Sequence, residues 1–106
     1  MDITDAEFET KVIEASKTKP VAVDFWATWC GPCRALAPVL DKVVKELGNK
    51  IELVKVNIDE NPEAAGRYMV RSIPAVKIFK DGNLVGEFIG ALPAGDVKKH
   101  FEEAIG

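Results

Sequence analysis

The chain has few of the residues on which several classes of function depend. Its 106 residues include one histidine and two cysteines, and its net charge is −3. A zinc site needs four ligands that are mostly cysteine or histidine, and a nucleic-acid surface needs clustered lysine and arginine, so both are disfavoured. Apolar runs such as residues 21–23 are far too short to span a membrane. We therefore expect no nucleic-acid partner and no membrane partner.

The size and composition favour one globular domain. With 47% hydrophobic and 29% charged residues, a chain of this length can bury one core, so we expect a single domain over residues 1–106, acting as a monomer. The first residues lack the basic start and the apolar core of a secretory signal. The expected compartment is the reducing cytoplasm, where a close pair of cysteines is more often catalytic or metal-binding than structural.

The hydrophobic pattern alternates between helices and strands. Thr4 and Glu7 have the spacing of a capping box, which predicts that a helix begins there. Three more helices are expected, one after the cysteines as far as Gly48, one over residues 61–68 and one at the C-terminal end; strands are expected over residues 21–27, 51–58, 76–80 and 84–89. Strands joined through helices should be parallel, and Asp81-Gly82 predicts a hairpin between the last two. The sequence thus predicts an α/β fold, with a mixed sheet covered by helices on both faces.

The two cysteines, Cys30 and Cys33, lie where a buried strand should end and a helix begin. A disulfide closing so short a loop stabilises a fold by only about 2 kcal/mol, against about 3 kcal/mol for a loop of fifteen residues. The spacing therefore indicates reversible thiol–disulfide chemistry. The positive end of the helix should favour the thiolate of Cys30, which would attack a disulfide. Cys33, one turn into the helix and expected to be more buried, would resolve the mixed disulfide.

The alternative interpretation of this pair is half of a zinc site, because the same spacing serves tetrahedral zinc. The chain offers only His100 as a further soft ligand, and the pattern of the last helix places it on or beside the polar face. We therefore expect no metal and interpret His100 as a surface residue.

Asp24 is unusual because every neighbour in residues 21–27 is apolar. Burial of a carboxyl group raises its pKa, and a group that titrates near neutral pH could accept the proton of Cys33 during resolution. The alternative is an outward-facing aspartate on a bulged or edge strand. Lys55 is similarly unexpected within a strand; it is a candidate partner of Asp24, and an ordinary solvent-exposed position explains it equally well.

Three further residues have two interpretations each. Pro74, after Ile73, either ends the preceding helical region or forms a cis bond in a tight turn. Trp26 and Trp29 could both be core residues, although Trp29, beside the cysteine at a strand end, is the better candidate for an exposed contact.

The order of these residues resembles the thioredoxin family. Residues 23–34 look like the family's active-site segment, with the sequence Val-Asp-Phe-Trp-Ala-Thr-Trp-Cys-Gly-Pro-Cys-Arg. The similarity continues in order through Ala37-Pro38, residues 55–59, Asn61-Pro62, Ile73-Pro74, residues 79–82 and Gly90-Ala91. It covers nearly the whole chain, which is far more specific than two spaced cysteines. It implies the thioredoxin fold, in which parallel strands and a C-terminal antiparallel hairpin form one sheet between helices.

The resemblance also implies roles for particular positions. Cys30 matches the nucleophilic cysteine, Cys33 the resolving one, Asp24 the buried aspartate that handles the proton, and Lys55 the lysine near it. Pro74 matches the family's cis-proline, which faces the disulfide. The flat apolar surface on which partner proteins dock, with the backbone that contacts bound substrate, is expected at Trp29, Gly31, Pro32, Ile73, Pro74 and Gly90.

Two departures from the family pattern lie beside the expected docking surface and at the start of the chain. Ser72 and Ala75 stand where glycine and threonine are common around the Ile-Pro pair, which bears on the range of partners. Only the residues around Ile3 remain for the family's first strand, so this strand is expected to be a stub.

Pro32 bears on the direction of the reaction, because oxidising members of the family tend to carry histidine there. Typical reduction potentials are about −270 mV for thioredoxins and about −180 mV for protein disulfide isomerase. The resemblance therefore implies a protein-disulfide reductase with no bound cofactor beyond its own disulfide. Electrons would come from NADPH indirectly through a thioredoxin reductase, and the partners would be that reductase and disulfide-containing client proteins. The alternatives are a disulfide oxidase or isomerase, and a binding module whose redox turnover is incidental.

Overall fold

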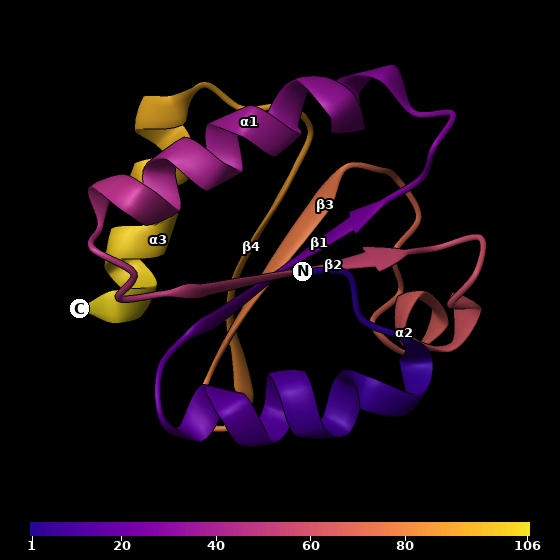
Figure 1. Ribbon diagram of the computed structural model, residues 1–106, viewed down its shortest axis with the longest axis horizontal. Helices are drawn as coiled ribbons and strands as arrows, with labels where there is room; N and C mark the ends of the chain where they lie inside the picture. The colour runs from indigo at the N-terminus through magenta and orange to yellow at the C-terminus, as the bar shows by residue number, and fades with distance from the viewer.

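A four-stranded mixed sheet forms the centre of the computed structural model, which describes residues 1–106 (Figure 1). The strands lie in the order β2-β1-β3-β4 and comprise β1 (Val21–Trp26), β2 (Glu52–Asn57), β3 (Ala75–Lys80) and β4 (Asn83–Ile89). The helices are α1 (Gly31–Glu46), α2 (Pro62–Arg67) and α3 (Ala94–Ile105). Helices α1 and α3 cover one face of the sheet, and the N-terminal helical segment with α2 covers the other. The expected α/β architecture is therefore confirmed.

The direction of β3 corrects one expectation. β1 and β2, joined through α1, are parallel as expected, and β3 and β4 form the expected antiparallel hairpin. β3 follows β2 through α2 and yet runs antiparallel to β1. The connection from β2 to β3, which includes α2, leaves the chain at the end of the sheet where β2 finishes instead of carrying it back along the strands. β3 therefore begins at the end of the sheet where β1 and β2 finish.

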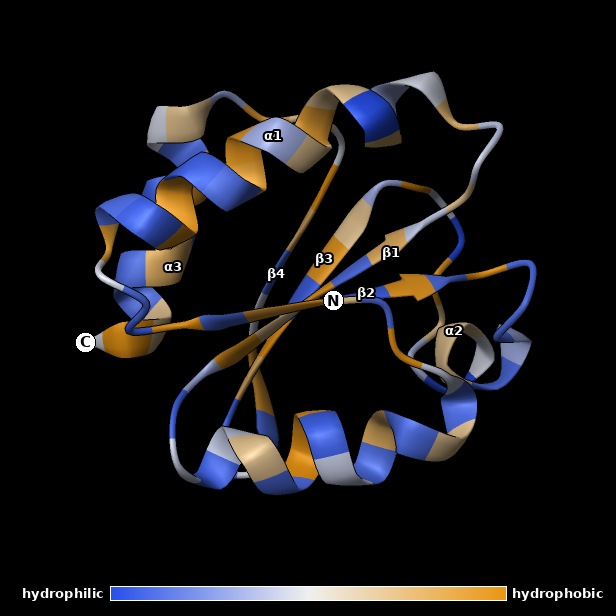
Figure 2. Ribbon diagram, viewed as in Figure 1, coloured by the Kyte–Doolittle hydropathy of each residue, from blue (hydrophilic) through white to orange (hydrophobic).

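Two hydrophobic clusters lie on opposite faces of the sheet because the side chains of β1 alternate. Val21, Val23 and Phe25 point into the cluster under the N-terminal helical segment and α2. Ala22 joins the cluster under α1 and α3, which includes buried leucines and valines of α1. Bands of hydrophobic residues along α1 alternate with hydrophilic ones (Figure 2), as expected for a helix with one buried face. The central strand β1 is thereby buried on both sides.

The N-terminal segment is helical as predicted, although its backbone is irregular. It consists of a 3₁₀ turn η1 (Asp5–Glu7), a π-helical segment η2 (Glu9–Glu14) and a second 3₁₀ turn η3 (Ala15–Lys17). The Glu7 carboxylate accepts hydrogen bonds from the backbone N–H of Thr4 at 3.0 Å and from its hydroxyl at 3.2 Å. The expected stub of a first strand is confirmed as a single parallel bridge between Asp2 and Lys55.

Asp5 joins the N-terminal segment to the start of α2. Its carboxylate accepts hydrogen bonds from the backbone N–H groups of Glu63, at 3.1 Å, and Ala64, at 2.9 Å. Its own backbone N–H donates to the Asn61 side chain at 2.9 Å. A short helix is marginal by itself, so this external cap holds α2 and the chain that leads from it to β3.

We predict that Asp5→Ala lowers the free energy of unfolding by about 1–2 kcal/mol, because two N–H groups at the start of α2 lose a charged acceptor. Urea denaturation measures this change. Glu60→Ala is the matched control: it removes an exposed acidic side chain beside the same helix that makes no hydrogen bond or ion pair. Equal losses in the two variants would contradict the capping role.

Candidate active site

Cys30 and Cys33 form a disulfide at the point where β1 leads into α1. Cys30 is the N-terminal capping residue of α1, and its Sγ accepts a hydrogen bond from the backbone N–H of Cys33 at 3.2 Å. The preceding turn is held by a backbone hydrogen bond from Cys30 to Ala27 at 3.2 Å. The predicted strand end and helix start are thus confirmed, and they place both sulfur atoms at the positive end of a 16-residue helix.

The two cysteines are equally inaccessible, contrary to the expectation that Cys33 would be more buried. The exposed fraction is 4% for Cys30 and 3% for Cys33. Ala27 packs against both, with Trp26, Ile58 and Ile73 at the margin. What distinguishes the two sulfur atoms is therefore their position on the helix: Cys30 caps it and Cys33 lies within its first turn.

Asp24 is buried in the middle of the sheet. Only 1% of the residue is exposed, and its Oδ1 atom has no hydrogen-bond partner. β1 is paired with β2 on one side and with β3 on the other, so the interpretation of Asp24 as an outward-facing residue on an edge strand is wrong. The side chain lies on the face of the sheet that α1 covers, which is also the face toward Cys33.

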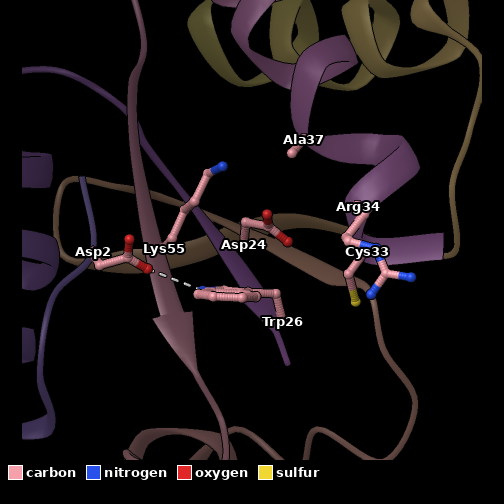
Figure 3. A pocket seen from close by; sticks show the side chains of 7 residues that line it. All are labelled: Asp2, Asp24, Trp26, Cys33, Arg34, Ala37 and Lys55. Carbon is pink, nitrogen blue, oxygen red and sulfur yellow. Dashed lines mark hydrogen bonds between the residues drawn. The ribbon is translucent and has the colours of Figure 1, made fainter. Parts of the chain in front are cut away.

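A cavity of about 180 Å³ connects this carboxyl group with the second cysteine (Figure 3). Asp24 and Trp26 reach it from β1, Lys55 from β2, and Cys33 from α1. Lys55 is opposite Asp24 in the parallel pairing of β1 with β2, which explains why the two side chains share one space. The remaining residues around the cavity are Asp2, Arg34 and Ala37.

Burial raises the pKa of Asp24 from its ordinary value of 3.8 to about 6. The loss of hydration around the carboxylate is the main cause, and the negative charges of Asp2 and Asp41 act in the same direction. The positive charge of Lys55 opposes the rise in the pKa. Asp24 therefore titrates close to neutral pH, as the apolar sequence around it predicts.

The residues predicted for the docking surface differ in exposure: Trp29, Gly31 and Pro32 are exposed, Ile73 and Gly90 are half-buried, and Pro74 is buried. Trp29 is 66% exposed, and its indole N–H donates to the Asp59 carboxylate at 2.8 Å. The peptide bond between Ile73 and Pro74 is cis, which decides between the two interpretations left open by the sequence. Gly90, with a φ of 95°, donates its backbone N–H to the Pro74 carbonyl at 2.8 Å.

Several residues of the site carried no signal that would single them out in the sequence. Asp2 is one acid among several near the N-terminus, and Asp59 belongs to a loop rich in polar residues. Arg34 donates to the Thr28 carbonyl at 2.9 Å and thereby joins α1 to the turn before Cys30. Each of these contacts depends on the packing of segments that are distant in the sequence or separated by the active-site turn.

His100 lies on α3 with its ring 5.0 Å from that of Phe88, and is half-buried. No group of three or more histidine, cysteine, aspartate or glutamate side chains lies close enough together to hold a metal ion. None of the helices combines the length and the apolar composition needed to cross a membrane.

Comparison with known proteins gives a consistent result over the whole chain. The profile of the Thioredoxin family matches residues 1–103. Thioredoxin 1 of Synechococcus elongatus is 49% identical over 102 residues, covering 92% of this chain and 94% of the relative. The thioredoxin of Chlorobaculum thiosulfatiphilum is 43% identical over 105 residues, covering 99% of this chain and 95% of the relative. The chloroplastic thioredoxin M4 of Arabidopsis thaliana is 44% identical, covering 95% of this chain and 51% of the relative.

We predict that Asp24→Asn raises the stability of the oxidised protein at pH 7 and leaves it unchanged below pH 4. Because the pKa of Asp24 is higher in the folded state, about 6 against 3.8, the folded state holds a proton that the unfolded state releases. The stability of the native protein therefore falls as the pH rises between these values, by up to about 3 kcal/mol. Urea denaturation at several pH values measures the difference.

The control for this experiment is Glu103→Gln, which removes an exposed carboxylate from α3 that does not act on Asp24. It should change the pH dependence of stability far less than Asp24→Asn. Equal stabilisation by Asp24→Asn at pH 4 and pH 7 would contradict a raised pKa at Asp24.

Proposed function

We propose that this chain, which belongs to the thioredoxin family and is a thiol–disulfide oxidoreductase, works as a protein-disulfide reductase that takes its electrons from a thioredoxin reductase. One observation carries the proposal: a disulfide at the start of α1 lies between an exposed apolar surface and a cavity that contains a buried carboxyl group. The surface suits a protein substrate, and the carboxyl group suits proton transfer.

In the first step, the reduced protein meets a client disulfide through Cys30. The Cys30 thiolate attacks one client sulfur, forms a mixed disulfide and expels the other client sulfur as a thiolate, which takes up a proton from water. The helix N-terminus and the N–H of Cys33, which lies 3.2 Å from the Cys30 Sγ, favour the anionic form of this sulfur. A thiol with an ordinary pKa of about 8.5 is only about 3% ionised at pH 7, so this stabilisation increases the reactive fraction.

In the second step, Cys33 attacks the Cys30 sulfur of the mixed disulfide and releases the second client thiolate. Two electrons have then passed from the two cysteines to the client, and the Cys30–Cys33 disulfide has formed. Cys33 must lose its proton as it attacks. Asp24 borders the same cavity and has a pKa of about 6, so it is the proposed acceptor.

Lys55 is proposed to moderate the proton affinity of Asp24. Its positive charge lowers the pKa of Asp24, whereas burial raises it. A buried carboxyl group without this cation would hold its proton more strongly, and it would accept a proton from Cys33 less readily at neutral pH. Lys55 thus keeps Asp24 within the range useful for a base.

The client is proposed to dock on the apolar surface around the disulfide, which comprises Trp29, Gly31, Pro32, Ile73, Pro74 and Gly90. Ile73 packs against the cluster that contains Cys30 and Cys33, so its backbone is a candidate contact for an extended client segment. Ser72 is exposed and Ala75 is buried, so of the two departures from the family pattern, Ser72 is the one placed to alter the range of clients.

Pro32 favours reduction over oxidation of clients, because it adds no positive charge that would stabilise the thiolate and thereby the reduced form. NADPH serves only indirectly, through the reductase. The proposed compartment is the cytoplasm, and the proposed form is a single-domain monomer over residues 1–106.

Insulin reduction by dithiothreitol tests the proposed activity. The native protein should accelerate precipitation of the insulin B chain, and Cys30→Ser should abolish this acceleration because it removes the attacking sulfur. Cys33→Ser, the control at the second cysteine, should accumulate a stable mixed disulfide when the reduced variant is mixed with its client in the absence of dithiothreitol. An inactive native protein would contradict the reductase function, and a client complex of full strength in Cys30→Ser would favour a binding module instead.

Single-turnover kinetics test the role of Asp24. Asp24→Asn should slow the resolution of the mixed disulfide at pH 7 by up to about 100-fold, because Cys33 loses its base, and should leave the first attack by Cys30 nearly unchanged. The native rate of resolution should rise with pH around 6, the pKa of Asp24. Equal rates of resolution in the two proteins from pH 6 to pH 8 would refute proton transfer to Asp24.

A further inference from the structure

The N-terminal residues add one charged side chain to the cavity of Asp24. Asp2 borders this cavity although it is far from the active-site segment in the sequence. Its carboxylate accepts a hydrogen bond from the Trp26 indole N–H at 3.0 Å, drawn as the dashed line in Figure 3. The indole extends from β1 to Asp2 and forms a wall of the cavity. Asp2 therefore contacts one residue of the site directly.

The backbone fixes Asp2 in this place. The N–H of Ile3 donates to the Lys55 carbonyl, and the N–H of Lys55 donates to the Met1 carbonyl, both at 2.8 Å. These two hydrogen bonds put Asp2 opposite Lys55 in a parallel bridge, so the two side chains lie on the same face of the sheet. Ile3 is 2% exposed and anchors the segment in the hydrophobic core. The position of Asp2 is thus set by the fold.

The charged and titratable groups around Asp24 come from three parts of the chain. β2 supplies Lys55, α1 supplies Arg34, Asp41 and the thiol of Cys33 when the protein is reduced, and the N-terminal segment supplies Asp2. The positively charged amino group of the chain belongs to Met1. Met1 lines other pockets on the surface but does not line the Asp24 cavity. Of the two acids Asp2 and Asp41, Asp2 is the one whose carboxylate accepts a hydrogen bond from a residue that lines the cavity, Trp26.

We propose that Asp2 is a positioning residue for thiol–disulfide exchange: it holds the Trp26 indole in place as a wall of the Asp24 cavity, and its negative charge favours the protonated form of Asp24. This inference rests on the proposed function of Asp24 as the proton acceptor. Lys55 and Asp2, paired across one bridge, then act on the same carboxyl group in opposite directions. The pKa of Asp24 reflects both, because the charge of Lys55 lowers it and that of Asp2 raises it.

Two substitutions separate the two parts of the proposal. Asp2→Asn removes the charge and keeps a carbonyl oxygen that can accept from the Trp26 indole. Asp2→Ala removes both the charge and the acceptor. Asp2 is exposed and lies outside the core, so both variants should fold. Glu103→Gln is the matched control, since it removes one negative charge from an exposed position of α3 away from the cavity.

The experiment is an NMR titration of the Asp24 carboxyl carbon in the oxidised protein, together with hydrogen exchange of the Trp26 indole N–H. In both Asp2 variants the pKa of Asp24 should fall by roughly 0.5 pH unit, the effect of one partly screened charge. Indole exchange should stay slow in Asp2→Asn and should become roughly fivefold faster in Asp2→Ala, since only the alanine variant loses the hydrogen bond. In single-turnover assays, the pH at which resolution accelerates should move down with the pKa.

An unchanged pKa of Asp24 in Asp2→Asn would overturn the proposed charge effect, as would an equal fall in Glu103→Gln. Unchanged indole exchange in Asp2→Ala would overturn the positioning of Trp26. The titration and the exchange measurement need no turnover, so their result is separate from that of the insulin assay. A failed insulin assay would count against the proposed function, whereas a failed titration would count against Asp2 alone.

Discussion

The rest of the site depends on the burial of one carboxyl group in the central strand. Asp24 lies between β2 and β3, is 1% exposed and leaves one oxygen atom without a hydrogen-bond partner. Such a group opposes folding whenever it is ionised, and the cost would be smaller if the fold offered it partners. The surrounding structure retains a cavity at this point where apolar residues could have filled it. A group whose burial lowers stability and whose pKa is raised to about 6 has the properties of a base.

The strand order explains why the charged and the apolar parts of the site meet at the disulfide. Because β1 is central, its carboxyl end delivers Cys30 to the start of α1, and its side chains toward α1 include Asp24 and Trp26. Because β3 runs antiparallel to β1, its first residues lie at the same end, and they bring the cis bond of Pro74 beside the cysteines. The path of the chain from β2 to β3 thus matters to the site, because it leaves Pro74 at the end of the sheet that carries the cysteines.

The sequence predicted those features that depend on local patterns. The helices and strands follow from periodicity and caps, and the role of Asp24 as a buried acid follows from its apolar neighbours. The direction of β3 could not be predicted in the same way, because it depends on the path of the whole connection from β2 to β3 and not on a local pattern. The similar burial of Cys30 and Cys33 was missed because Ala27 and its neighbours cover both. The contact between Asp2 and Trp26 joins residues 24 positions apart, and no periodic pattern indicates it.

The single bridge between Asp2 and Lys55 is all that stands for a first strand, and on the proposal above it still influences the proton affinity of Asp24. A single bridge to Lys55 adds little to the stability of the sheet, since only two backbone hydrogen bonds hold it. The bridge does, however, determine which side chain stands opposite Lys55 at the cavity. A neutral residue at position 2 would leave the cation of Lys55 less opposed, and Asp24 would then ionise at lower pH. On the proposed role of Asp2, the identity of residue 2 is therefore a means by which the proton affinity of the site can change without any change in the cysteines, the aspartate or the lysine.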